Sequence, residues 1–181
     1  MSILSVYHAS SPALPNKVLT HLEDIASTLA EQGIGFSRLP ATTPIKAGAS
    51  HHDVLDAYRV QVDQIMTENG LSAVEVISVD GAHAHDAQWR AGLLVEHRHD
   101  TDELRLIIAG RGLLSLHIGE FVYAVLCEKN DLIAVPAGTR QWFDLGEQPR
   151  LIALRLFKDT NGQQSSSTGD ALASEFPRLD D

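Results

Sequence analysis

The spacing of apolar residues along the chain changes near residue 73. Before that point, the segments 17–32 and 53–69 carry apolar side chains three and four positions apart, which places them on one face of a helix. Gly33 and Gly70 follow these segments, and glycine is the residue that most often ends a helix. We therefore expect residues 1–72 to be mainly helical.

After residue 72 the apolar runs become short, and turn-forming residues separate them. The runs cover residues 73–79, 93–97, 104–109, 113–118, 121–127, 132–135, 141–145 and 151–157. Many short strands separated by turns are typical of a β-sandwich or a small barrel. We expect this β structure over residues 73–160, and a Ser- and Gln-rich tail over 161–181 with a short helix near 170–175.

The composition supports one domain over residues 1–181. With 44% hydrophobic residues, a chain of this length buries roughly 70% of the surface that its unfolded form exposes. The net charge of −10, from 14 Lys and Arg against 24 Asp and Glu, argues against a nucleic acid or an anionic membrane as a partner. No apolar run approaches the ~20 residues that span a bilayer, and no basic segment precedes an apolar one at the N-terminus. We therefore expect a soluble cytoplasmic protein.

The single cysteine and most of the nine histidines have an ordinary structural explanation. Cys127 excludes an intramolecular disulfide and an all-thiolate metal site, and its apolar run predicts a small buried hydrophobe. His117 also lies in an apolar run, where a hydrogen-bonded structural histidine is expected. The histidines expected in solvent are His51, His52, His83 and His85.

The segment 96–105, with the sequence Glu-His-Arg-His-Asp-Thr-Asp-Glu-Leu-Arg, carries the pattern that points to chemistry. Alternate residues of a strand share a face, so His97 and His99 point the same way, and Glu103 and Arg105 share a face of the next strand. Two imidazoles and one carboxylate suit iron, nickel, manganese or zinc, and non-haem iron oxygenases use this set with open positions. Arg105 fits an anionic or enolate oxygen through a charge-assisted hydrogen bond.

Two motifs of the second half resemble those of the cupin superfamily. Gly92 followed by His97-x-His99-x3-Glu103-x6-Gly110 resembles the first cupin motif, and Asp131 with Pro136-x-Gly138 resembles the second. Further features narrow the resemblance, over most of the chain, to the bacterial acireductone dioxygenase family. These are the helical N-terminal part and residues 96–105, 125–133, 142–144 and 176–179.

This resemblance implies a mainly β protein, a cupin (jelly-roll) β-barrel with an N-terminal helical segment, that binds one Fe²⁺ or Ni²⁺ as a monomer. It implies oxidative cleavage by O₂ of the acireductone of methionine salvage, 1,2-dihydroxy-3-keto-5-methylthiopentene. The iron form of the family yields a 2-keto acid and formate, and the nickel form also releases carbon monoxide.

The metal ligands of the family are matched at three positions of four. His97, His99 and Glu103 match, but Gln141 stands where the family has its fourth ligand, a histidine. An amide oxygen is a harder and weaker ligand than an imidazole. Gln141 can ligate through its carbonyl oxygen, stand back and leave three ligands with a water, or cost so much affinity that the protein works without metal. The presence of the other ligands and of Arg105 favours the first two alternatives.

The resemblance also implies the residues around the substrate. Arg105 matches the arginine that orients the substrate, and Glu96 is expected beside it as a catalytic neighbour. Phe143 and Leu93 are expected to line the substrate pocket, and Leu93 stands where the family has an aromatic residue.

The leading hypothesis is therefore a metal-dependent dioxygenase that acts on acireductone or on a related enediol or dicarbonyl. Two alternatives lack oxygenase activity: a small-metabolite-binding cupin, which Gln141 motivates, and a metal-dependent isomerase or lyase, which needs only a Lewis-acid metal and a base. Full metal occupancy with oxygen uptake would exclude the binding protein. Turnover without oxygen would favour the isomerase or lyase.

Overall fold

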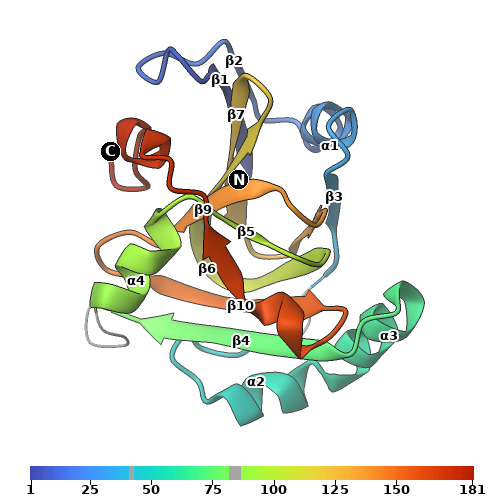
Figure 1. Cartoon of the computed structure of the whole chain (residues 1–181). Helices are drawn as coiled ribbons and strands as arrows, with labels where there is room; N and C mark the ends of the chain where they lie inside the picture. Colours follow the sequence, from blue (N-terminus) through green and yellow to red (C-terminus); the bar gives the residue numbers. More distant parts are fainter. Residues whose placement is uncertain (41–42, 82–86) are drawn as a thin grey trace.

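The computed structural model describes residues 1–40, 43–81 and 87–181, and Figure 1 shows the course of the chain. The helices are α1 (Leu22–Ala30), α2 (His51–Ala57), α3 (Arg59–Asn69), α4 (Ala87–Leu94) and the short 3-10 helices η1 (Thr160–Gln163) and η2 (Leu172–Glu175). The strands are β1 (Ile3–His8), β2 (Lys17–Leu19), β3 (Gly35–Arg38), β4 (Ala73–Asp80), β5 (His97–His99), β6 (Glu103–Ile118), β7 (Phe121–Glu128), β8 (Asp131–Val135), β9 (Arg140–Asp144), β10 (Arg150–Phe157) and β11 (Ser165–Ser167). None of the helices in these ranges is long and apolar enough to cross a membrane.

The long strand β6 belongs to two sheets. Its first half, residues 103–110, pairs with β10 and β8, and its second half, residues 111–118, pairs with β7 and β9. Gly110 lies where the two halves meet and has a φ of +75°, a conformation that favours glycine. A side chain there would also overlap the carbonyl group of Arg150. The glycine thus allows β6 to bend from one sheet into the other.

The strand pairs of the described residues are all antiparallel, and β5 is the strand next to one edge of its sheet. One sheet runs in the order β11-β5-β9-β6-β7-β1-β2, and the other runs β4-β10-β6-β8-β3. The short strand β5 therefore lies between the barrel strand β9 and the tail strand β11, which comes from near the C-terminus.

The apolar side chains form three clusters that define an inside and two outer faces. The cluster between the sheets includes Leu116 and Phe143. A second cluster, with Tyr58 and Leu154, joins the sheet of β4 and β10 to α2 and α3, which run along β4 in Figure 1. The third cluster packs Trp142 and other outer-face residues of the β9 sheet against the C-terminal tail.

The structure corrects two of the predicted elements. Residues 17–32 do not form one helix, because Lys17–Leu19 pair with β1 as an edge strand and the helix begins at Leu22. Residues 93–97 do not form a strand, because they span the end of α4 and the start of β5. No buried stripe marks α4, so its sequence lacks the periodic signal that identifies a helix.

Other predictions agree with the structure apart from their boundaries. The remaining predicted strands are present, but 104–109 and 113–118 are joined in the single strand β6 and not separated by a turn. Residues 53–69 are helical but divided at Tyr58 into α2 and α3. The N-terminal part is less helical than expected, because it also contributes the strands β1, β2 and β3. His51 and His52 are exposed as expected, whereas His83 and His85 lie outside the described residues.

Candidate metal centre

The barrel interior brings together the predicted ligand residues from three strands. His97 on β5 lies opposite Gln141 on β9, and the rings of His97 and His99 are 5.5 Å apart. Glu103 and Arg105 alternate with Leu104, which packs on the outer cluster, so both point inward from β6. Each of these five polar side chains is at most 7% exposed.

Backbone carbonyl groups fix which nitrogen of each imidazole carries the proton. His97 Nδ1 lies 2.7 Å from the Val95 carbonyl oxygen, and His99 Nδ1 lies 2.9 Å from that of Gly162. A carbonyl oxygen can only accept, so both Nδ1 atoms must donate and both neutral rings keep their lone pair on Nε2. This is the form in which an imidazole binds a metal through Nε2.

Burial and the neighbouring charges keep the two imidazoles neutral. Burial lowers the pKa of His97 below its ordinary value of 6.5, and it lowers the pKa of His99 in the same direction. For His99 the nearby Glu103 carboxylate opposes this shift, but the guanidinium groups of Arg155 and Arg105 act with burial. Neutral rings at pH 7 are the state in which imidazoles are metal ligands.

Glu103 is ionised despite its complete burial. Burial alone would raise its pKa, but the positive charges of Arg105 and Arg155 outweigh burial and lower the pKa to about 2. Arg105 Nη2 lies 2.6 Å from one carboxylate oxygen, and Arg155 Nη2 lies 3.1 Å from the other. The carboxylate is therefore a charged donor at neutral pH.

Arg155 is the site residue that sequence reasoning missed. Its Nη2 lies 2.8 Å from Nε2 of His99, and a guanidinium can only donate, which again requires the Nδ1–H form of this ring. Arg155 lies opposite Arg105 on the neighbouring strand β10. The available signal was one charged residue within the apolar run 151–157, since a charge in a buried strand needs a partner.

Several buried polar atoms of this interior have no hydrogen-bond partner within the protein. They include Gln141 Oε1, Arg155 Nε and the Nε and Nη1 atoms of Arg105. Buried donors and acceptors are nearly always paired, so a group of unpaired ones fits the binding of a further group. Two Nε2 lone pairs, a carboxylate and an amide oxygen suit a divalent metal, and the free guanidinium donors suit an anionic ligand.

Glu96 is not brought into this interior, contrary to the expectation that it lies beside Arg105. Its carboxylate accepts hydrogen bonds from His117 Nδ1 at 2.8 Å and from Thr168 Oγ1 at 2.7 Å. His117 follows Leu116, which packs in the interior, so His117 lies on the outer face of β6. His117 is thus the hydrogen-bonded structural histidine that the sequence predicts.

A second group of candidate ligands lies on that outer face. Within the part of the chain that the structure describes, Glu96, His117 and Asp170 are the one set of three such side chains with ligand atoms all within 4.8 Å of one another. His97, His99 and Glu103 do not meet this limit as a set of three, although His99 Nε2 lies 3.6 Å from Glu103 Oε2 and Arg155 Nη2 contacts both of these atoms. Both carboxylate oxygens of Glu96 already have partners within the protein.

The two residues expected around a substrate differ in how closely they approach Arg105. The Phe143 ring lies 4.4 Å from Arg105 Cζ, a cation–π contact that orients the guanidinium. Leu93, near the end of α4, is half-buried against the same interior cluster as Phe143. Trp142 points to the opposite face and packs under the tail.

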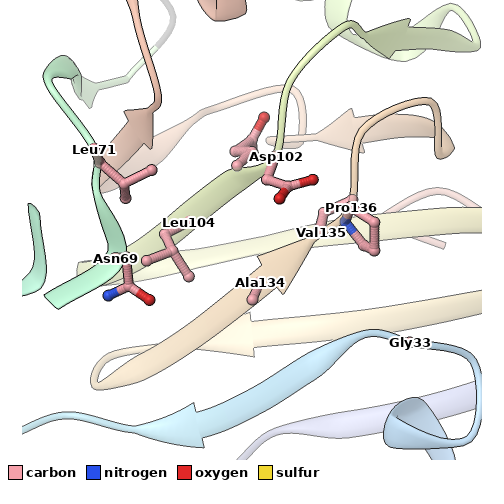
Figure 2. A pocket seen from close by; sticks show the side chains of 9 residues that line it. Gly33, Asn69, Leu71, Asp102, Leu104, Ala134, Val135 and Pro136 are labelled. Carbon is pink, nitrogen blue, oxygen red and sulfur yellow. The ribbon is translucent and has the colours of Figure 1, made fainter.

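A cavity of about 240 Å³ lies beside the interior but does not contain the ligand set. Figure 2 shows Asp102, from the turn between β5 and β6, near Pro136 at the end of β8. Of the predicted site residues, only Glu103 is among those that line this cavity. The Arg155 guanidinium lies against His99 Nε2 and Glu103 Oε2, the side of the ligand set where a metal would bind.

Comparisons with known proteins agree with the fold and the donor set. The model of the ARD/ARD′ family matches residues 7–165. Acireductone dioxygenases of Pseudomonas fluorescens and Pseudomonas syringae pv. syringae are 61% and 60% identical over 181 residues, which is the whole of this chain and of each relative.

A solved structure shows the same architecture. Acireductone dioxygenase from Bacillus anthracis, with a cadmium ion in its active centre, superposes with a TM-score of 0.78 at 20% identity. The match covers 92% of this chain and 98% of that one, so the mainly β cupin fold is confirmed. With a family match across most of its length and relatives identical at three positions of five, this chain belongs to the acireductone dioxygenase (ARD/ARD′) family.

Proposed function

We propose that this chain is a metal-dependent dioxygenase that uses O₂ to cleave 1,2-dihydroxy-3-keto-5-methylthiopentene or a closely related enediol. Full-length identity of 61% to an acireductone dioxygenase supports this assignment. The observation that carries it is the pair of buried imidazoles with protonated Nδ1 atoms, next to an ionised Glu103. Such an enzyme of methionine salvage is expected to work in the cytoplasm as a monomer.

We propose Fe²⁺ or Ni²⁺ as the metal, held by Nε2 of His97 and His99, by the Glu103 carboxylate and by Gln141 Oε1. Metal binding at His99 would require the Arg155 guanidinium to leave Nε2. The metal would supply a Lewis acid that binds the enediol oxygens and brings the substrate together with O₂. The unpaired, buried Gln141 Oε1 supports ligation by the amide rather than a set of three ligands with a water.

The two arginines would bind the negative charge of the enediolate. Arg105 keeps two buried guanidinium nitrogens free of protein partners, and Phe143 holds its plane in place. Arg155 shares the Glu103 carboxylate with Arg105 and contacts His99. Its guanidinium would therefore stabilise negative charge that develops next to these two ligands. Donors that are preorganised in a site closed to water stabilise a developing oxyanion most strongly.

Oxygen uptake with acireductone tests this function. Protein loaded with Fe²⁺ or with Ni²⁺ should consume O₂ and substrate together, and both activities should disappear when Glu103→Gln removes the charged ligand. Arg98→Lys is a matched control, because Arg98 lies between the two histidines but points to solvent. Substrate turnover without O₂ would overturn the dioxygenase assignment in favour of an isomerase or lyase. Binding of the metabolite without any turnover would favour a binding protein.

A further inference from the structure

The backbone of the C-terminal tail pairs with the strand that carries His97 and His99 and forms hydrogen bonds with the His99 ring. Residues 162–168, which we call the C-terminal strap, contain β11, and β11 pairs with β5 so that Ser165 lies opposite His99 and Ser167 opposite His97. Two carbonyl groups of the strap, those of Gly162 and Gln164, lie 2.9 and 3.1 Å from His99 Nδ1. A segment more than sixty residues away in the sequence therefore accepts the Nδ1–H of His99, on the opposite side of the ring from Arg155, which donates to Nε2.

Close packing fixes the first end of the strap. A Cβ atom on Gly162 would overlap Thr101 Oγ1 and would lie 2.9 Å from Phe157 Cβ. Thr101 belongs to the turn that joins β5 to β6, and the Phe157 ring lies 5.5 Å from the ring of His99. The Asp159 side chain also accepts a hydrogen bond from the Gly162 N–H at 3.3 Å. The Gly162 carbonyl is thus held by its surroundings, and no other residue type fits there without displacing them.

Hydrogen bonds fix the second end of the strap. The Thr168 N–H donates to the Glu96 carbonyl oxygen at 3.1 Å, and its hydroxyl donates to Glu96 Oε1 at 2.7 Å. The other oxygen of this fully buried carboxylate bonds His117 on β6. Thr168 is therefore linked through Glu96 to the wall of the barrel, and Glu96 directly precedes the β5 strand that carries both imidazoles.

We propose that the C-terminal strap is a positioning element for His99, with Gly162 and Thr168 as the positioning residues at its two ends. Carbonyl oxygens of the strap accept a hydrogen bond from Nδ1–H of His99, so the lone pair of the ring is on Nε2, which faces Glu103. This inference rests on the proposed function, because the direction of Nε2 matters for a ring that binds a metal. Removal of such an outer partner of a metal-bound histidine typically lowers metal affinity or activity by about 10–100-fold.

The first test reads the tautomer of His99 in metal-free protein and needs no activity. Nuclear magnetic resonance of ¹⁵N-histidine-labelled protein at mildly alkaline pH should show His99 as the Nδ1–H form in the wild type. Gly162→Ala should shift the Nδ1–H signal and speed the exchange of this proton with water, because the strap no longer holds it, even though Arg155 still donates to Nε2. A folded Gly162→Ala protein with the wild-type His99 signals would overturn the proposal.

The second test measures affinity for Co²⁺ from its visible absorption. Gly162→Ala should weaken Co²⁺ binding by at least about tenfold, and Thr168→Val should weaken it in the same direction but by less. Thr168→Ser, which keeps the hydroxyl, should restore the wild-type affinity, and Ser166→Ala on the exposed side of the same strand should leave it unchanged. Should Gly162→Ala not fold, the Thr168 pair decides, and equal affinities for Thr168→Val and Thr168→Ser would overturn the proposal. If the wild type bound no Co²⁺ but kept the Nδ1–H form of His99, the proposed function would fall and the positioning would stand.

Discussion

His97 on β5 lies directly opposite Gln141 on β9 in the antiparallel register. Both side chains are buried, and Gln141 Oε1 has no partner within the protein. The pair therefore offers one nitrogen and one oxygen donor from neighbouring strands. A histidine at position 141 would offer two nitrogens from the same places, so the substitution changes the kind of donor and not the architecture that presents it.

Substitution of Arg105 should lower the rate of the reaction without lowering the metal content of the protein. Arg105→Lys removes the planar guanidinium that stacks on Phe143, and loss of one such preorganised donor costs about 10²–10³-fold in kcat. Metal content should stay at the wild-type level, because Arg105 donates and cannot ligate. Steady-state oxygen uptake together with metal analysis checks this, with Arg98→Lys as the exposed control. An Arg105→Lys enzyme with wild-type kcat would refute the substrate-orienting role.

The metal-free protein should lose stability as the pH falls. The pKa values of His97 and His99 are lowered from 6.5, so the unfolded chain takes up protons first and stability falls once the pH drops below about 6.5. Glu103, with a pKa of about 2 against its ordinary 4.5, adds stability above pH 4.5 that is lost as the pH falls toward 2, roughly 3 kcal/mol in total. Urea unfolding at a series of pH values measures both losses.

The Glu103 share of this pH dependence can be separated from the rest. Glu103→Gln should flatten the dependence below pH 4.5 and leave the part near pH 6 in place. Stability that stays level or rises between neutral pH and pH 4 would show that these groups are not buried in the charge states described.

Gly112 should be intolerant of a side chain because of its contact with Phe143. A Cβ there would lie 2.6 Å from two carbon atoms of the Phe143 ring, so the ring that contacts Arg105 would have to shift. Overpacking of this kind costs about 1–3 kcal/mol, so Gly112→Ala should lower the free energy of unfolding by that amount and reduce kcat. Gly92→Ala is the matched stability control, because nothing lies within 4 Å of its Cβ position. Equal stability of the two variants would contradict the packing described.

How much of the site the sequence predicts depends on how local each contact is. The inward pairs His97 with His99 and Glu103 with Arg105 follow from strand alternation, which holds wherever a short strand is buried on one face. Arg155 and the C-terminal strap could not be found in this way, because they reach His99 from β10 and from the tail by long-range strand pairing. Register between distant strands leaves no periodic trace in one sequence.

Glu96 shows the opposite failure, in which a local pattern is misleading. It directly precedes His97, and strand alternation sends neighbouring side chains to opposite faces. The carboxylate accordingly lies against His117 and Thr168 outside the barrel interior. The resemblance to a family brought the residue to notice, but the alternation of a strand already argued against a place beside Arg105.

The metal content of the purified protein tests the central claim most directly. Protein made with added iron or nickel and freed of loose metal by gel filtration should hold about one metal ion per chain if the four buried donors form the proposed site. Gln141→His should raise the affinity by about tenfold or more, since an imidazole replaces a weaker amide oxygen, and Gln141→Leu should lower it. Less than about a tenth of an equivalent in the wild type, with no gain in Gln141→His, would contradict the assignment of His97, His99, Glu103 and Gln141 as a metal centre.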